Sequence, residues 1–326
     1  MATATNQDVL RGGIDLGGTK IQAAIITAKG EVVGDARRPT PTKGGPADVT
    51  EQMSAALVDA AEAAGVVTDS LAGIGVGSPG DTDEATGSVS NALNLPGWEG
   101  TYPLGPRLSE ALGAPVLIGN DVDVATTAEF KLGAGRPYRS MLGVFWGTGV
   151  GGGLVLDGEP WTGRGAAGEI GHMVIKRGGA RCPCGRRGCM EAYAGRAAME
   201  AKARRDYSDG AKTDLFEIMA KRDRERLTSS IWERALRADD PMATKLVDRA
   251  VKAIAAAAAS AVNLLDVDAV IIGGGLGLRL GETYVKRIRK RMSKHLFVDE
   301  NPPAVLLASL GDFGGAIGAS LLFDKS

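Results

Sequence analysis

The stretch Gly12–Ile26, GGIDLGGTKIQAAII, predicts a strand, a tight turn and a second strand. An apolar run leads to Asp15, two glycines interrupt it, and apolar residues return at every second position from Ile21. About 130 residues later, Met141–Leu156, MLGVFWGTGVGGGLVL, repeats this plan with a longer glycine-rich turn. The repeat predicts that the two halves of the chain contain similar units, each built around a glycine-turned hairpin.

Strand and helix patterns alternate in both halves, which predicts an α/β fold with two domains and a cleft between them. We expect a small domain over 1–119 plus 310–326, and a large domain over 120–309. Helices are expected at 49–65, 104–112 and 242–265, in the charged region 191–240 and in a small-residue segment within 310–322, and strands at 74–80, 115–118 and 269–272.

The composition excludes several classes of protein. The 38 basic and 39 acidic residues leave a formal charge of −1, so we expect no electrostatic binding of nucleic acid or of a membrane surface. The longest apolar run, 253–262, is shorter than the ~18 residues of a membrane span. The first ten residues lack a cationic start followed by an apolar stretch, so we expect no secretory signal and a cytoplasmic location.

The first hairpin offers the groups that a polyphosphate needs. Its turn presents the backbone amides of Gly17 and Gly18, the hydroxyl of Thr19 and the ammonium group of Lys20, while Asp15 offers an oxygen that can hold Mg²⁺ through water. A plain hairpin with a glycine turn is the alternative, and for one such motif alone it is the commoner explanation.

The second hairpin favours the phosphate hypothesis. Gly147, Thr148 and Gly149 are followed by three further glycines within four residues, although glycine weakens a strand and offers no side chain to bury. We therefore expect a ligand to approach this backbone. Neither hairpin has the Walker or the dinucleotide-binding spacing. Two such hairpins on two halves resemble the actin and hexokinase superfamily of sugar kinases, which implies a ribonuclease H-like fold.

The three cysteines of the chain, Cys182, Cys184 and Cys189, lie within eight residues, and His172 precedes them by ten. An odd number of thiols in a reducing compartment argues against disulfides. Three thiolates and one imidazole complete the tetrahedral ligand set of a structural Zn²⁺ ion, with no open position for catalysis. Surface thiols beside a core histidine are the alternative.

Seven segments taken together resemble the ROK family, named for repressors, open reading frames and kinases. They follow one another in order over nearly the whole chain, and the cysteine segment is specific to that family. The resemblance implies an ATP-dependent hexose kinase that uses Mg²⁺ with the nucleotide, most often a glucokinase, and commonly a homodimer. The segments are Asp15–Lys20, Gly75–Gly80, Asn94–Trp98, Asn120–Asp121, Gly147–Gly153, Glu169–His172 and Cys182–Glu191.

By this resemblance Asp121 is the catalytic base that accepts the proton of the sugar 6-hydroxyl. The residues agree, because Asp121 follows a buried-type strand and phosphoryl transfer needs little more than one positioned base and charge stabilisation. The alternative is that Asp121 is the N-cap of a helix over 122–131. Asp123 is a rival carboxylate, but it lacks the preceding asparagine.

The resemblance also assigns the sugar and adenosine contacts. His172 would have two roles if one ring nitrogen binds zinc and the other donates to a sugar oxygen. Gly274 and Gly275 match the adenosine side, although an ordinary turn from strand to helix has the same pattern. The residues expected around the sugar are Gly77, Asn94, Asn120, Asp121, Glu169, His172 and Glu191.

Other functions stay open at this level. The same motifs occur in kinases of N-acetylmannosamine and fructose, and polyphosphate is an alternative donor, although the chain lacks the excess of basic residues that a long polyanion favours. A sugar-responsive repressor would need a helix-turn-helix segment, and about eleven residues before the first strand are too few. A sugar sensor without activity would need the loss of a catalytic part.

Overall fold

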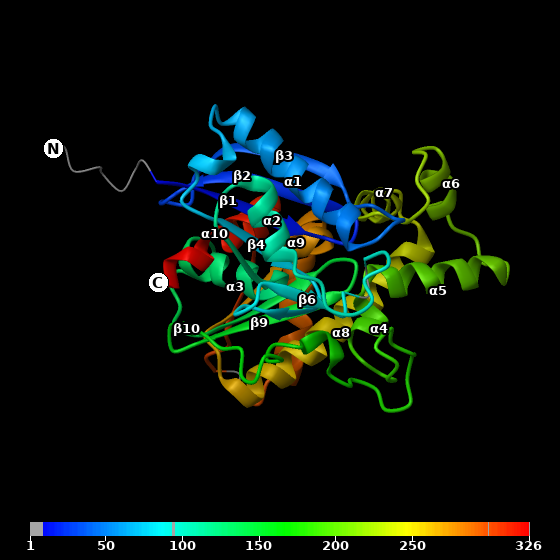
Figure 1. Ribbon diagram of the computed structural model, residues 1–326. Helices are drawn as coiled ribbons and strands as arrows, with labels where there is room; N and C mark the ends of the chain where they lie inside the picture. The colour runs from blue at the N-terminus through cyan, green and yellow to red at the C-terminus, as the bar shows by residue number, and fades with distance from the viewer. Residues whose placement is uncertain (1–8, 93–94, 299, 326) are drawn as a thin grey trace. The chain divides into compact units, whose positions relative to one another are not determined.

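The computed structural model describes residues 9–92, 95–298 and 300–325 (Figure 1). The chain divides into two compact units, one of Met1–Arg136 with Ser309–Ser326 and one of Pro137–Ala308. The first expected boundary, after residue 119, lies inside the first unit, and the second, after residue 309, lies one residue past the observed crossing.

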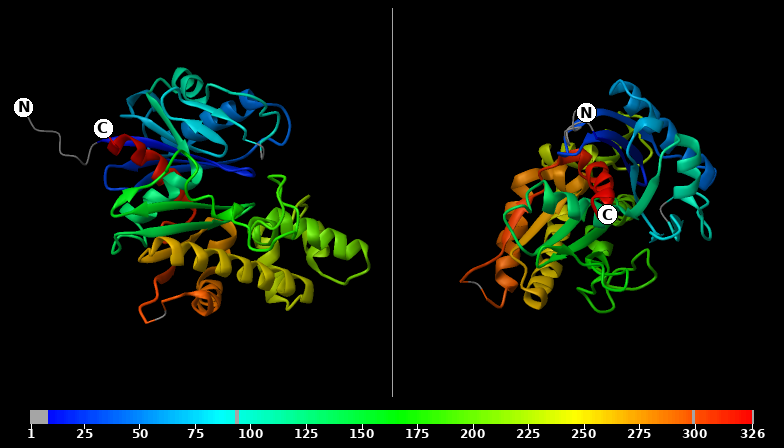
Figure 2. Two further views of the ribbon diagram at one scale, coloured as in Figure 1. Left: turned by 90° about the horizontal axis from the view of Figure 1, so that it is seen from below. Right: turned by 60° about the vertical axis from the view of Figure 1, so that its left-hand side comes forward.

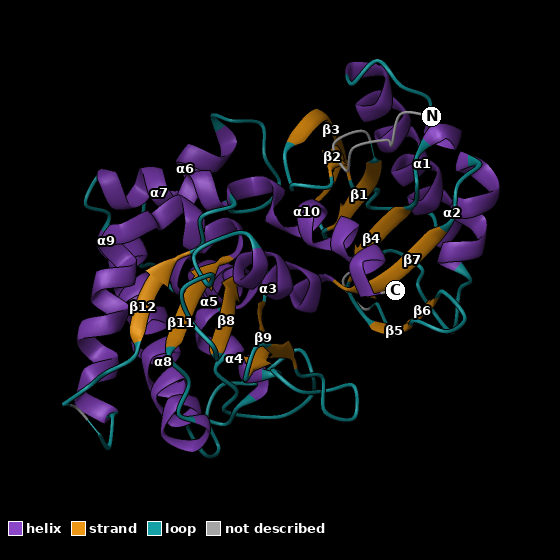
Figure 3. Cartoon of the chain, turned by 90° about the vertical axis from the view of Figure 1, so that its left-hand side faces the viewer, coloured by secondary structure: helices purple, strands orange, loops and turns teal. Residues whose placement is uncertain are grey.

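The first unit is built on a five-stranded sheet in the order β3-β2-β1-β4-β7. Strands β1 and β2 form the antiparallel hairpin expected from the sequence, and β4 and β7 continue the sheet in parallel with β1 (Figure 3). Strand β3 was not expected, and its three charged residues, Asp35, Arg37 and Arg38, suit an edge strand. The strands are β1 (Leu10–Leu16), β2 (Lys20–Thr27), β3 (Val32–Pro39), β4 (Ile74–Ser78) and β7 (Val116–Asn120), with a separate hairpin of β5 (Asp81–Asp83) and β6 (Ser88–Ser90).

Helices cover both faces of this sheet. Neighbouring residues of β1 point to opposite sides, and each side meets a different helix. A side chain at Gly12 would meet Leu57 of α1 at 3.1 Å, and one at Gly13 would meet the Ala316 carbonyl of α10 at 2.0 Å. The glycines therefore let both helices approach closely. The helices are α1 (Pro46–Ala63), α2 (Leu104–Leu112), α3 (Asp121–Lys131) and α10 (Gly314–Ser320), with 3₁₀ turns at Thr68–Ser70, Gly311–Phe313 and Leu321–Lys325.

The second unit repeats the topology of the first, which confirms the internal repeat and the α/β class. Its sheet has the order β10-β9-β8-β11-β12, in which β8 and β9 form the antiparallel hairpin and β11 and β12 run parallel to β8. The strands are β8 (Met141–Trp146), β9 (Val150–Leu156), β10 (Glu159–Pro160), β11 (Ala269–Gly273) and β12 (Ala304–Leu307).

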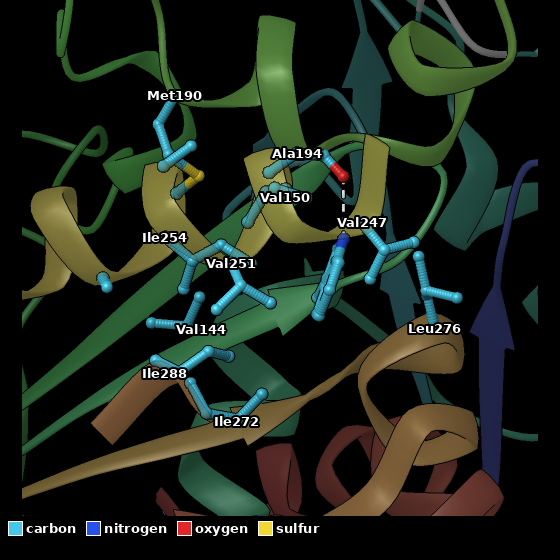
Figure 4. Close-up of a cluster of buried hydrophobic side chains, with 14 of the residues drawn as sticks. Val144, Val150, Met190, Ala194, Val247, Val251, Ile254, Ile272, Leu276 and Ile288 are labelled. Carbon is cyan, nitrogen blue, oxygen red and sulfur yellow. Dashed lines mark hydrogen bonds between the residues drawn. The ribbon is translucent and has the colours of Figure 1, made fainter. Parts of the chain in front are cut away.

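The long helix α8 forms the centre of the second core. Its buried alanines allow close packing on α4 and α9. The helix is the long yellow-orange ribbon in Figure 2. The indole of Trp146 is fully buried and donates a 2.7 Å hydrogen bond to the Ala194 carbonyl (Figure 4). The helices are α4 (Glu191–Ala194), α5 (Arg196–Ser208), α6 (Leu215–Ala220), α7 (Ser229–Arg237), α8 (Pro241–Leu265) and α9 (Gly274–Met292), with 3₁₀ turns at Ile170–His172 and Ser293–His295. None of the helices described is long and apolar enough to cross a membrane.

A buried carboxylate fixes the segment that returns to the first unit. Glu129 of α3 is 2% exposed and accepts hydrogen bonds from the amides of Ala134, Ser309 and Leu310 at 2.9, 3.0 and 2.9 Å. No local sequence pattern points to Glu129. It joins the end of α3 to a segment about 180 residues later, so its partners become visible only in the folded chain.

We expect Glu129→Ala to lower the free energy of unfolding by about 3 kcal/mol, because three part-buried amides would lose a buried acceptor and each unsatisfied group costs about 1–3 kcal/mol before relaxation. Glu129→Gln keeps one acceptor oxygen and should lose less. Urea unfolding monitored by circular dichroism measures both, and equal losses in the two variants would contradict this account.

Candidate active site and metal centre

Asp121 is the first residue of α3, directly after β7. The N-cap is its neighbour Asn120, whose Oδ1 accepts from the amides of Val122 at 2.9 Å and Asp123 at 3.3 Å. The alternative that Asp121 caps this helix is therefore wrong. Asn120 has its oxygen committed to the cap, so its Nδ2 amide is the group that can meet a sugar hydroxyl.

Adjacent strands bring Asp15 and Gly77 to the same edge of the sheet as Asp121. Asp15 pairs with Gly77, and Gly77 pairs with Gly119. A side chain at Gly77 would begin 3.3 Å from the Cα of Asp121 and 2.9 Å from Val124. Glycine at position 77 therefore gives α3 the space to begin here, while its contact with a sugar stays a prediction.

The two carboxyl groups at this edge have raised pKa values. Burial, and next the charge of Asp15, raise the pKa of Asp121 to about 7. Burial also raises the pKa of Asp15 to about 6, against the lowering effect of Lys20. A carboxylate whose pKa is close to neutrality is well matched to general-base catalysis, because it can be deprotonated at neutral pH and still accept a proton.

The turn of the first hairpin is held by Thr40, a residue that the sequence analysis missed. Its buried hydroxyl donates to the Gly17 carbonyl at 2.6 Å, and its amide donates to the Thr19 carbonyl at 3.4 Å. Both carbonyl oxygens are thereby engaged by the protein. The phosphate-binding role expected for Gly17, Gly18 and Thr19 stays a prediction.

Lys20 is anchored on both sides. Its Nζ donates to Oε1 of the buried Gln22 at 2.7 Å and lies 3.5 Å from Oδ1 of Asp312, which also pairs with Arg37 at 2.9 Å. Against the effect of burial, Lys20 and Arg37 lower the pKa of Asp312. Asp312 was not predicted from the sequence, because it lies almost 300 residues from Lys20 and no local pattern connects them.

In the second hairpin, protein groups occupy part of the space beside the glycines. A side chain at Gly149 would meet Oε2 of Glu191 at 2.2 Å, and one at Gly152 would meet the Gly168 carbonyl at 2.6 Å. The expectation that a ligand explains the whole glycine run is therefore wrong at these two positions. The amide of Gly147 closes the turn by donating to the Gly149 carbonyl at 3.0 Å.

Two of the segments expected to bind the nucleotide, Gly147–Gly149 and Gly274–Gly275, lie next to each other within the second unit. Gly274 has a φ of +77°, and a side chain there would lie 2.6 Å from the amide of Trp146. A side chain at Gly147 would begin 4.0 Å from the amide of Gly275. The start of α9 and the hairpin turn are thus neighbours, and the adenosine role of Gly274 and Gly275 stays a prediction.

The cysteine segment forms a compact ligand set. The ligand atoms of His172, Cys182, Cys184 and Cys189 all lie within 4.8 Å of one another. The Sγ atoms of Cys184 and Cys189 are 3.8 Å apart, as are Sγ of Cys182 and Nδ1 of His172. Two sulfurs on one tetrahedral zinc ion with Zn–S bonds of ~2.3 Å are separated by ~3.8 Å. The four residues therefore fit a tetrahedral metal ion.

Local backbone geometry explains why the set forms. Gly185 adopts a φ of +86° and donates to the Cys182 carbonyl at 3.0 Å, which closes a tight turn around Cys184. Burial raises the pKa of the Cys182 and Cys189 thiols. A dication would offset that cost, because a coordinating thiol is deprotonated by its metal.

Two of the residues expected at the sugar adjoin this ligand set. His172 directs Nδ1 towards Cys182, and its Nε2 lies 3.8 Å from Glu169. Glu191 places Oε1 3.7 Å from the Cys182 thiol, while its Oε2 accepts from the Val150 amide at 2.9 Å. The cysteine segment and the second hairpin are therefore joined by one carboxylate. Asn94 lies outside the described residues.

The sequence matches the ROK family over residues 11–326. The chain belongs to the ROK family. It is 34% identical to the glucokinase of Halalkalibacterium halodurans over 95% of this chain and 93% of that one. It is 33% identical to the N-acetylmannosamine kinase of Haemophilus influenzae over 96% of both. The ROK family glucokinase of Streptomyces griseus, solved in complex with glucose and AMPPNP, superposes with a TM-score of 0.83 at 29% identity, covering 97% of this chain and 100% of that one.

We expect the Cys184→Ala variant of this ROK protein to lose its bound metal and to melt at a lower temperature, since a structural metal contributes folding free energy. Elemental analysis of the purified protein should find about one zinc per wild-type chain and a marked loss in the variant. Unchanged zinc content in the variant would contradict the assignment.

Proposed function

We propose that this ROK protein is an ATP-dependent glucokinase, which transfers the γ-phosphoryl group of ATP to the 6-hydroxyl of glucose. The observation that carries the proposal is the position of Asp121. It lies at the end of a parallel strand, it is not used as the helix cap, and its pKa is raised to about 7. Glucokinases about one-third identical over nearly the full length support the same activity.

In this proposal Asp121 accepts the proton of the sugar 6-hydroxyl while the oxygen attacks the γ-phosphorus. The bond between that phosphorus and the leaving oxygen of ADP breaks as the new O–P bond forms. The Asn120 amide can orient a hydroxyl beside the base. In the second unit, His172, Glu169 and Glu191 offer further donors and acceptors for sugar hydroxyls.

Two ions are part of the proposal. Mg²⁺ bound with the nucleotide would supply charge stabilisation, and Asp15, whose pKa is raised to about 6 by burial, offers the carboxylate oxygen for it. Zn²⁺ on His172 and the three cysteines would be structural. It would fix the ring orientation of His172, whose Nδ1 already points towards Cys182.

We expect Asp121→Asn to lower kcat by ~10² or more with a small change in the KM for glucose, because general-base catalysis contributes ~10²–10⁴-fold. A coupled assay of ADP formation measures both constants. Asp123→Asn removes a carboxylate two residues away and is the matched control, which should keep most of the wild-type kcat. A similar loss of kcat in both variants would contradict the assignment of Asp121 as the general base.

Asp121 also predicts how activity and stability depend on pH. The base must be deprotonated, so kcat/KM for glucose should rise with pH and level off above about 7.

The folded-state pKa of Asp121 lies above the unfolded value near 3.8, so Asp121 favours the folded state at low pH and loses that contribution as pH rises through about 7. The Tm advantage of Asp121→Asn over wild type should therefore grow between about pH 4 and 7, and a constant difference would contradict this.

N-acetylmannosamine kinase is a second candidate, because a relative of that activity is almost as similar as the glucokinases. A panel of glucose, mannose, fructose and N-acetylmannosamine, each with Mg-ATP and with polyphosphate, separates the candidates. We expect the highest kcat/KM for glucose with ATP. If none of the four sugars is phosphorylated with either donor, the proposal that this protein is a sugar kinase is wrong. The cytoplasmic location and the homodimer stay predictions.

A further inference from the structure

Arg196 is a buried cation directly behind the turn of the second hairpin. It is the first residue of α5 and only 7% exposed. Its guanidinium donates to the Thr148 hydroxyl at 2.7 Å and to the Leu227 carbonyl at 3.0 Å. Its Nε has no hydrogen-bond partner in the described part of the chain. Burying an arginine whose hydrogen-bond partners are neutral costs folding free energy. The shorter of its two hydrogen bonds is the one to Thr148, a residue of the hairpin turn.

The carboxylate of Glu200 interacts with the charge of Arg196 but makes no direct hydrogen bond to its guanidinium. Glu200, one helical turn later, accepts from Arg204 through Oε1 and from the Leu227 amide through Oε2. Burial lowers the pKa of Arg196, with Glu200 acting in the opposite direction. Positive charge therefore remains behind the turn.

The backbone of α5 holds the same turn. The amides of Arg196 and Ala197 donate to the carbonyls of Gly147 and Thr148 at 3.1 and 3.0 Å. These two carbonyl oxygens, which would repel an anion, therefore point towards α5. No peptide bond in the described chain is cis, so the following amides, of Thr148 and Gly149, point to the opposite side.

The hydrogen bond also decides what the Thr148 hydroxyl can do. A guanidinium can only donate, so the Thr148 oxygen is the acceptor and its own hydrogen must point elsewhere. Thr148 is partly exposed, and the hydroxyl hydrogen can thus be offered to a ligand that accepts. Phosphate oxygens at neutral pH are acceptors. Two amides and one hydroxyl donor are the groups that a phosphate chain needs.

We propose that Arg196 is a positioning residue that orients Thr148 and its turn to bind the terminal phosphates of a nucleoside triphosphate. This inference rests on the proposed kinase function. Arg196 acts through Thr148 and does not itself touch the ligand. The first hairpin has a comparable arrangement, because Thr40 engages the carbonyls of Gly17 and Thr19.

The test compares Arg196→Met in three backgrounds, with threonine, serine or valine at position 148. We expect Arg196→Met to raise the KM for MgATP by about tenfold and to leave the KM for glucose unchanged, since a hydrogen bond to a charged group contributes about that much. The increase should persist with Thr148→Ser, which keeps the hydroxyl. It should disappear with Thr148→Val, in which MgATP binding is already weakened.

Arg205→Met is the matched control, because it removes the same charge from an exposed position on the same helix. It should retain the wild-type KM for MgATP. Calorimetric titration with a non-hydrolysable ATP analogue gives the affinity independently of turnover. Circular dichroism establishes that each variant is folded.

An unchanged KM for MgATP in a folded Arg196→Met variant would overturn the inference, as would an equal increase in the serine and valine backgrounds. If methionine at 196 prevents folding, Arg196→Lys carries the test. Lysine keeps the charge but lacks the planar fork, so MgATP binding should still weaken, and unchanged binding would overturn the inference. A wild-type chain that neither binds the analogue nor phosphorylates any sugar would instead refute the proposed function.

Discussion

Glycines leave open the space that two carboxylates, those of Asp15 and Glu191, and the backbone of Asp121 occupy. The backbone of Asp121 lies 3.3 Å from where a side chain at Gly77 would begin, and the carboxyl carbon of Asp15 lies 2.6 Å from that point at Gly315. Oε2 of Glu191 lies 2.2 Å from the same point at Gly149. Within each unit, strand ends, helix starts and turns meet at backbone distance, and side chains larger than hydrogen at these glycines would displace Asp15, Glu191 or the backbone of Asp121. The positions of all three acids therefore depend on these glycines.

This close packing has an electrostatic consequence. Carboxyl groups held against backbone lose part of their hydration, and burial is the main cause that raises the pKa of both Asp15 and Asp121. The nearby cations are committed to other partners: Lys20 contacts Gln22 and Asp312, and Asp312 also pairs with Arg37. A base with a pKa near neutrality and a turn with fixed donors are the two features that phosphoryl transfer to an alcohol requires.

The cysteine segment extends the same principle to the second unit. Its tight turn at Gly185 gathers three thiols and one imidazole, and Glu191 then connects this ligand set to the amide of Val150 in the hairpin. A metal ion there would stiffen a loop region that has little regular secondary structure of its own. The orientation of His172 and Glu191 would follow from metal coordination, and α5 would hold the hairpin from its other side through Arg196.

The sequence alone was sufficient to predict the elements with strong local signals: both glycine-turned hairpins, helices α2 and α8, the α/β class, and the grouping of His172 with the three cysteines. These depend on periodicity, turn residues and spacing within a short stretch. It did not determine the edge strand β3, whose polar residues pair only because β2 is beside it. Nor did it determine which partner each glycine meets, or the roles of Thr40, Glu129, Arg196 and Asp312. Each of those residues contacts at least one group that is about 20 to almost 300 positions away, and only the tertiary structure brings such groups within hydrogen-bonding distance.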